Sequence, residues 1–231
     1  MKNNLPENLY PTTRQAISVM VLAFFAMLLS GAFTTEWDNK YLFITSRVIF
    51  VIPMFVFLLR ENYSMRMLLR LRPVSLRIAG ISAMIGLCLG IIGEELDRIM
   101  TMIIPLPEEL LELLNSGMQA ESALDWLVLI VGVIVLTAIL EELLFRCFLQ
   151  TTLESKLDIT RAVITTAFVF SFFYANPISI VQIVLAGVVL GVLAWKSDSF
   201  LPSACAHMMI NAVGIALADH FLGQAGILNW N

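Results

Sequence analysis

Two short groups of polar residues stand inside long apolar stretches of this chain, and their side chains are of types that can hydrolyse a bond. Glu141, Glu142 and Arg146 lie near the end of the apolar stretch that begins at about residue 125. His207 and Asn211 lie within the last apolar stretch. Ionisable groups inside a membrane span are costly, so they usually carry function or pair with each other. A carboxylate can act as a general base, an imidazole can bind a metal or move a proton, and an amide can donate to an oxyanion.

Helix geometry assigns different tasks to the residues of the first group. Glu142 and Arg146 are four residues apart with the acid first, so on a helix they share a face and pair favourably. Glu141 points about 100° away from that face and lacks this partner, so we interpret it as the base that activates water. An alternative is that both glutamates lie near the membrane interface and are merely solvated.

The second group lies at a matching depth. Glu141 is about nine residues, or roughly 13 Å, from the cytoplasmic end of its helix, and His207 is about eight residues, or roughly 12 Å, from the start of its own. Costly polar groups at one depth on two helices indicate one buried site, with a base, an oxyanion donor and room for one metal. The alternative is a histidine bonded to a neighbouring helix, with Asn211 holding two helices together. A site inside the membrane favours a membrane peptide or a lipid-modified chain as substrate.

Composition indicates which elements must position these residues. Hydrophobic residues make up 59% of the 231 residues and charged residues 14%, whereas soluble domains have about 45–50% and about 25%. The chain is therefore predicted to be all-α, a polytopic bundle of about seven transmembrane helices that forms one membrane domain over 1–231. The lipid bilayer is its partner, and the absence of a basic stripe excludes nucleic acid. The predicted spans are 15–34, 42–59, 76–93, 125–149, 161–176, 178–195 and 200–221.

The distribution of charge predicts the orientation of the bundle. Five arginines between the second and third spans should stay in the cytoplasm, which also places the N-terminus there; these are Arg60, Arg66, Arg70, Arg72 and Arg77. An acidic loop is predicted between the third and fourth spans, with a short amphipathic surface helix, or an ordinary loop, at 107–116. The loop acids are Glu94, Glu95, Asp97, Glu108, Glu109, Glu112 and Glu121. Arg47, inside the second span, is expected to snorkel or to pair with one of these loop acids.

The motifs resemble those of the CPBP family of intramembrane proteases, which includes the CAAX prenyl endopeptidases and the bacterial Abi proteins of bacteriocin processing and self-immunity. The family's EExxxR motif stands here at 141–146 and its HxxxN motif at 207–211. Gly187-x-x-x-Gly191 and the segment from Trp195 to Pro202 are similar to the connection between the motifs. The resemblance covers roughly 125–215, which we interpret as the core that carries the site.

The resemblance implies a role for each residue. Glu141 would activate water, helped by a histidine of the family's second motif. His207 and Asn211 would bind a metal or stabilise the oxyanion, and Glu142 and Arg146 would support them. A metal mechanism, with zinc held by His207 and Glu141, and a metal-free mechanism both stay open.

The second motif, FxxxH, departs from the family pattern. Aligned on Asn176-Pro177, the histidine position holds Tyr174, and in a competing register it holds Asn176. Three hypotheses follow: an intramembrane endopeptidase with Tyr174 in the site, an inactive membrane scaffold or bacteriocin-immunity partner, and a transporter. A short chain without paired broken helices argues against the transporter. The compact size and Abi-like motifs favour a bacterial cytoplasmic membrane. Nothing in the sequence indicates an oligomeric state.

Overall fold

The computed structural model describes residues 10–33, 39–61, 63–104, 122–174, 176 and 178–224 of the 231 residues. The surface helix predicted at 107–116 lies outside these ranges. All regular structure within them is helical, which confirms the predicted all-α membrane bundle. The helices are α1 (Thr13–Phe33), α2 (Asn39–Arg60), α3 (Met65–Leu68), α4 (Leu76–Ile103), α6 (Ala123–Val128), η2 (Leu129–Thr137), α7 (Ala138–Glu142), η3 (Leu143–Gln150), α8 (Thr151–Glu154), α9 (Ile159–Tyr174), α10 (Ile180–Ser197) and α11 (Leu201–Gln224).

A helix was found for each of the seven predicted spans, with the fourth span built from α6, η2, α7, η3 and α8 in succession. Five helical segments in the described part are long and apolar enough to cross a membrane. The segments Ile159–Tyr174 and Leu201–Leu217 are apolar but shorter. The chain is thus a polytopic membrane protein, and seven as the number of crossings stays a prediction.

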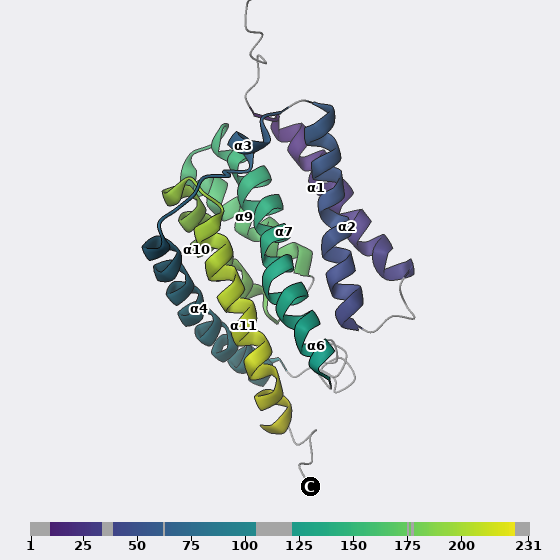
Figure 1. Cartoon of the computed structure of the whole chain (residues 1–231), viewed down its shortest axis with the longest axis vertical. Helices are drawn as coiled ribbons and strands as arrows, with labels where there is room; N and C mark the ends of the chain where they lie inside the picture. Colours follow the sequence, from purple (N-terminus) through teal and green to yellow (C-terminus); the bar gives the residue numbers. More distant parts are fainter. Residues whose placement is uncertain are drawn as a thin grey trace, which may run out of the picture.

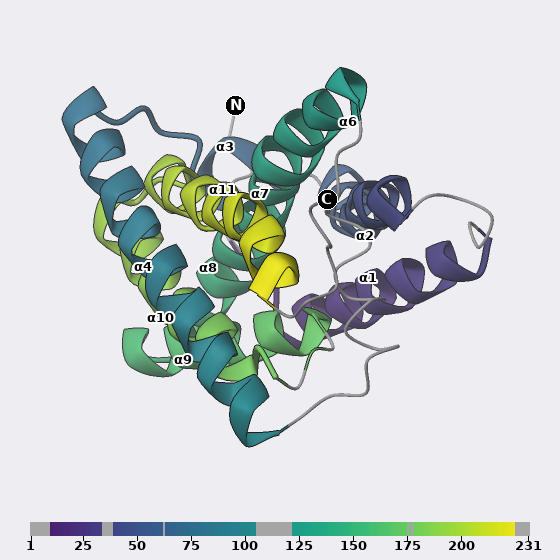
Figure 2. The same ribbon diagram turned by 90° about the horizontal axis from the view of Figure 1, so that it is seen from below.

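The helices form two groups on either side of a central pair. The α1–α2 hairpin lies on one side, and α4, α9 and α10 lie on the other (Figures 1 and 2). Between them run α7 and α11, which contact each other. The central pair carries Glu141 and Glu142 of the first motif and His207 and Asn211 of the third, so the fold brings these residues to the middle of the bundle.

Glycines allow α4 to pack closely against α11. A Cβ built on Gly86 would lie 2.0 Å from the carbonyl oxygen of Ala206, and one built on Gly90 would lie 2.8 Å from the Cβ of Val213. Small residues at such contacts let helix backbones approach each other in membranes, where packing replaces the hydrophobic effect. The position of α11, and with it that of His207, therefore depends on these two glycines.

The third span is predicted to end at 93 and to be followed by an acidic loop. This prediction is wrong for the first residues of the loop. Helix α4 runs on to Ile103, so Glu94, Glu95 and Asp97 are helical. Two of these acids have polar partners, because Arg98 Nη2 lies 2.6 Å from Glu95 and Ser179 donates to Asp97 at 2.6 Å. Gln182 of α10 also donates to Asp97. These contacts let the helix continue through a stretch that looks like a loop by composition.

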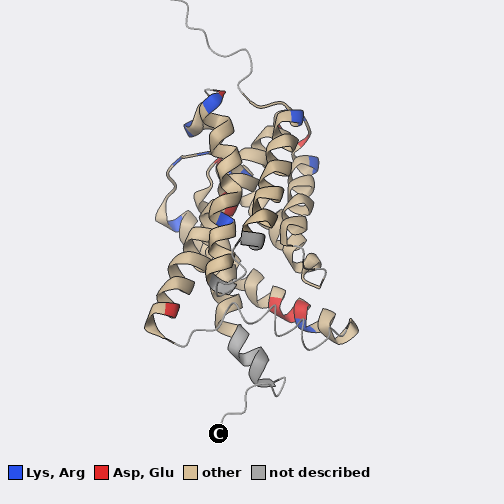
Figure 3. Cartoon of the chain, turned by 90° about the vertical axis from the view of Figure 1, so that its right-hand side faces the viewer, with Lys and Arg blue, Asp and Glu red and all other residues tan. Residues whose placement is uncertain are grey.

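The outer surface is typical of a protein embedded in lipid. Large apolar side chains such as Leu22, Phe25 and Phe168 are more than half exposed on it. Lysine and arginine gather mainly at the end of the bundle that carries α3, whereas Glu94, Glu95 and Asp97 lie toward the opposite end, on the last turns of α4 (Figures 1 and 3). A surface of this kind identifies the chain as an integral membrane protein.

Candidate active site

The two glutamates of the first motif lie on a short α-helical segment between two π-helical ones. Helix α7 (Ala138–Glu142) is preceded by η2 and followed by η3, and both carboxylates are buried. Short π-helical segments inside α-helices are frequent at functional sites, because they redirect side chains. Glu141 contacts residues of α2 and α9, and Glu142 contacts α11, so the consecutive acids face different neighbours.

Glu141 has a different partner at each of its two oxygens. The Tyr174 hydroxyl donates a hydrogen bond to Oε2 at 2.7 Å. The Arg47 Nε lies 2.9 Å from Oε1, but its N–H is not directed at the oxygen, so this contact is an ion pair without a hydrogen bond. No residue in the described part donates a hydrogen bond to Oε1. Oε1 therefore has a lone pair that no hydrogen-bond donor of the described residues uses.

The predictions that Arg47 snorkels or pairs with a loop acid are wrong. The side chain of Arg47 is only 6% exposed, and it pairs with Glu141. A buried carboxylate needs a counter-charge, and α2 packs against α7 closely enough to supply one. An arginine inside an apolar span was the signal in the sequence that Arg47 has a special role. Its partner could not be predicted from spacing along the chain.

Glu142 is held by α11 and by its own helix. His207 Nδ1 lies 2.9 Å from Glu142 Oε1, and because an ionised carboxylate can only accept, Nδ1 is the donor of this bond when Glu142 is charged. The predicted pair of Glu142 with Arg146 is present, with 3.5 Å between Oε2 and Nε. The Arg146 guanidinium also lies 4.6 Å from the centre of the Phe170 ring. Glu142 thus fixes the orientation of the His207 ring.

His207 bridges the two glutamates. Its Nε2 lies 3.6 Å from Glu141 Oε2, which is too long for a direct hydrogen bond. The Phe170 ring packs edge-on against the imidazole, with 5.8 Å between ring centroids. Glu141, Glu142, Tyr174 and His207 are therefore gathered into one cluster, from three helices that lie far apart in the sequence.

Asn211 uses its amide in a different contact. Its Nδ2 donates to the carbonyl oxygen of Val133 in η2 at 3.1 Å. This matches the alternative in which Asn211 holds two helices together. One N–H of the amide is engaged by this bond, and the other is the one that a reacting group could use.

The donors at this site do not fit a zinc centre. Catalytic zinc takes three protein ligands, commonly histidine, carboxylate or cysteine. Across the described ranges no three such residues are grouped as metal ligands. In the cluster, Glu142 is engaged by His207 Nδ1 and by Arg146, which leaves Glu141 and the His207 Nε2. The cation of Arg47 already lies against Glu141.

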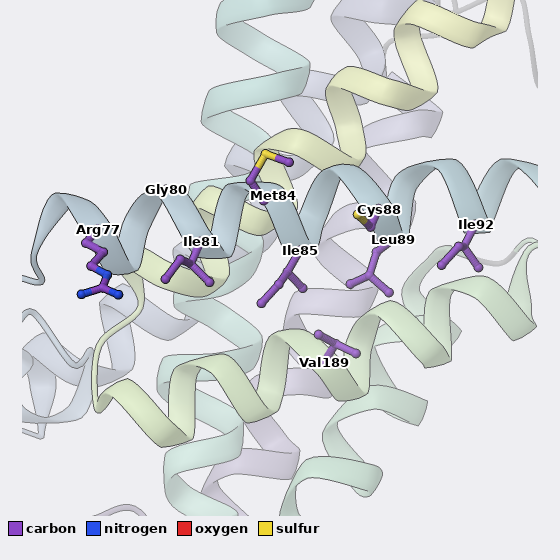
Figure 4. A pocket seen from close by; sticks show the side chains of 9 residues that line it. All are labelled: Arg77, Gly80, Ile81, Met84, Ile85, Cys88, Leu89, Ile92 and Val189. Atoms are coloured by element: carbon purple, nitrogen blue, oxygen red, sulfur yellow. The ribbon is translucent and has the colours of Figure 1, made fainter.

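A groove of about 650 Å³ between α4 and α10 contains none of the predicted site residues (Figure 4). Its walls are apolar side chains such as Met84 and Leu89, with Arg77 at one end. It is lined by no carboxylate and no imidazole.

Residues 123–213 match the family model for Rce1-like type II CAAX prenyl endopeptidases, which confirms the family that the motifs predicted. The matched segment runs from α6 into α11 and includes all six residues predicted for the site, whereas Arg47 lies outside it. No curated protein and no solved structure matched the chain. The match supports a function of the CAAX-type intramembrane endopeptidase kind.

Proposed function

We propose that this chain, with its segment of the CAAX prenyl endopeptidase type, hydrolyses a peptide bond of a membrane-associated or lipidated peptide. Glu141 is the general base. The observation that carries this proposal is the buried carboxylate whose Oε1 has no hydrogen-bond donor among the described residues and whose other oxygen faces His207. A base prepared in this way within an apolar bundle is costly to maintain unless it is used.

The reaction needs only groups that the cluster contains and one water. Glu141 accepts a proton from water while the water oxygen attacks the peptide carbonyl carbon. The negative charge passes to the carbonyl oxygen, where we assign two donors to it: the second N–H of Asn211, and the Nε2–H of His207 in its doubly protonated form, whose Nδ1–H stays on Glu142. The carbon–nitrogen bond then breaks, and Glu141 returns the proton to the departing amine. Tyr174 keeps Glu141 Oε2 in place throughout.

The test compares membrane peptides and new N-termini from cells that make the wild type or Glu141→Ala at equal levels. A cleavage product present only with the wild type would establish proteolysis and name the substrate. Identical peptide patterns, with both proteins inserted in the membrane, would contradict the proposal.

The alternative is an inactive membrane scaffold or bacteriocin-immunity partner with the same fold. The observation that favours it is the tyrosine at the position of the second-motif histidine. It predicts a stable co-purifying membrane protein and full function of Glu141→Gln. Cleavage by the purified wild type that is lost in Glu141→Gln would exclude it.

Substitutions at Tyr174 distinguish two cases. Either the tyrosine replaced a catalytic histidine with a loss of activity, or the site now depends on the tyrosine. Tyr174→Phe removes the donor to Glu141 Oε2, and since hydrogen bonds to charged groups are worth about 1.5–3 kcal/mol, we expect kcat to fall about 10- to 100-fold. Tyr174→His should also lower kcat, because the present geometry depends on the hydroxyl. The measurement is the cleavage rate of the purified enzyme on the substrate identified above. Tyr63→Phe, which alters a ring stacked on Phe57, is the control and should cleave normally. Higher activity in Tyr174→His would mean that tyrosine replaced the histidine at a loss.

We further propose that the end of the bundle with α3 faces the cytoplasm of a bacterial cell, with the N-terminus on the same side. The gathering of arginines at that end supports this orientation. Cysteine substituted at the exposed position of Arg66 should then resist a membrane-impermeant thiol reagent in intact cells and react after lysis. The reagent is applied in a background without Cys88, Cys147 and Cys205. Labelling in intact cells would reverse the orientation.

A further inference from the structure

We propose that Arg47 is a positioning residue for the reaction: it supplies the counter-charge of Glu141 and holds the carboxylate so that one oxygen can receive water. This inference rests on the proposed function. It adds a residue of α2 to a site whose other members all lie within the segment that matches the family.

The surroundings of Arg47 fix its guanidinium group in one place. The carbon at its centre lies 4.7 Å from the centroid of the Phe43 ring and 5.7 Å from that of Phe50, which are four and three residues away on α2. Its Nη1 donates to the sulfur of Met27 on α1 at 3.1 Å. A charge enclosed by rings and a sulfur has lost most of its water, so it interacts strongly with the one carboxylate beside it.

That carboxylate is held from two sides. Arg47 lies against Oε1, and Tyr174 donates to Oε2. Arg47 and Tyr174 also contact each other, with 5.0 Å between the guanidinium carbon and the ring centroid. The three side chains form a closed triangle from α2, α7 and α9, in which moving any one disturbs the other two.

The triangle has a chemical consequence for Glu141. A carboxylate buried in an apolar region without a counter-charge takes up a proton instead of remaining charged. A protonated Glu141 could not accept a proton from water. Arg47 therefore supports the reaction by keeping Glu141 charged, without contacting the substrate. It belongs to the same triangle of side chains as Tyr174.

A different role for the same contact would be a latch, in which Arg47 blocks Oε1 until a substrate displaces it. The two roles predict opposite effects of removing the side chain. A positioning residue lowers kcat when it is lost, whereas a latch raises it.

The experiment measures kcat and KM, per folded molecule, for purified full-length protein in lipid nanodiscs, with the peptide identified by the Glu141→Ala comparison. The variants are Arg47→Gln, Arg47→Lys and the control Arg70→Gln. Arg70 is also buried, and its substitution removes ion pairs with Glu154 and Asp198, but it lies at the α3 end and outside the cluster. Size-exclusion profiles and thermal unfolding give the folded fraction of each variant.

We expect kcat to fall about 100-fold in Arg47→Gln with KM within about twofold, which is the scale of a misplaced catalytic group. Arg47→Lys keeps the charge but not the planar group between the rings, so its kcat should fall about tenfold. Arg70→Gln should keep the wild-type kcat. In the double variant Arg47→Gln/Tyr174→Phe, the fold-decrease in kcat should be smaller than the product of the two single fold-decreases, because both substitutions disrupt the same triangle of side chains.

Wild-type kcat in Arg47→Gln, or in Arg47→Lys if the glutamine variant does not fold, would overturn the inference. A kcat above that of the wild type would replace it with the latch. Loss of cleavage in Glu141→Gln together with wild-type kcat in Arg47→Gln would remove this inference and leave the proposed function intact. Cleavage that survives in Glu141→Gln would remove both.

Discussion

Gly86→Ala is expected to destabilise the bundle by about 3 kcal/mol, the upper end of what overpacking costs. The new Cβ would lie 2.0 Å from the carbonyl oxygen of Ala206 and 2.6 Å from its Cα, and both atoms belong to the backbone. No change of rotamer can relieve such a contact, so α4 and α11 must move apart. Thermal unfolding of the purified protein measures the effect. Activity should fall as well, because Ala206 precedes His207 in the chain.

Gly80→Ala is the matched control for this prediction. It lies on the same helix, but a Cβ at this position meets nothing within 4 Å. Alanine is favoured over glycine in a helix by about 1 kcal/mol, so this variant should be as stable as the wild type or slightly more so. If Gly86→Ala unfolded at the same temperature as Gly80→Ala, α4 and α11 would not pack as closely as described.

His207→Ala is expected to reduce both stability and cleavage. It removes the donor to Glu142 Oε1, and a buried charged group left without its hydrogen bond costs about 3 kcal/mol. It also removes a group that we assign to the oxyanion, and losing one such donor lowers kcat by about 100- to 1000-fold. The measurements are thermal unfolding and the cleavage rate per folded molecule.

His207→Gln separates the two effects. Its amide can donate to Glu142, so it should recover most of the lost stability. It has no second ring nitrogen to face Glu141, so cleavage should stay as low as in the alanine variant. Normal cleavage by His207→Gln would show that the histidine acts only by supporting Glu142.

The architecture could be predicted from the sequence because membrane spans are a local property. A stretch of about 20 apolar residues must form a helix to satisfy its own backbone in lipid, whatever lies next to it. For this reason a helix was found for every predicted span. The pair of Glu142 and Arg146 was predictable on the same grounds, since it depends on spacing within one helix.

The partners of the buried polar residues, in contrast, were decided by contacts between helices. The partner of Arg47 is 94 positions later in the chain, and no spacing rule relates α2 to α7. The helical continuation of α4 beyond residue 93 is supported by hydrogen bonds to Asp97 from Gln182 of α10 and from Ser179, the residue just before that helix. The amide of Asn211 donates a hydrogen bond to a backbone carbonyl of η2. The sequence did not indicate that this segment is a π-helix.

The sequence by itself thus determined the helices, the resemblance to a protease family and the set of residues that could take part in chemistry. The tertiary structure alone decided which of those residues meet. The physical reason is that a buried charge takes whichever partner packing brings within about 3–4 Å. In this bundle that packing depends on close contacts such as those of Gly86 and Gly90 with α11. It brings Arg47, Tyr174 and His207 around Glu141 from three different helices.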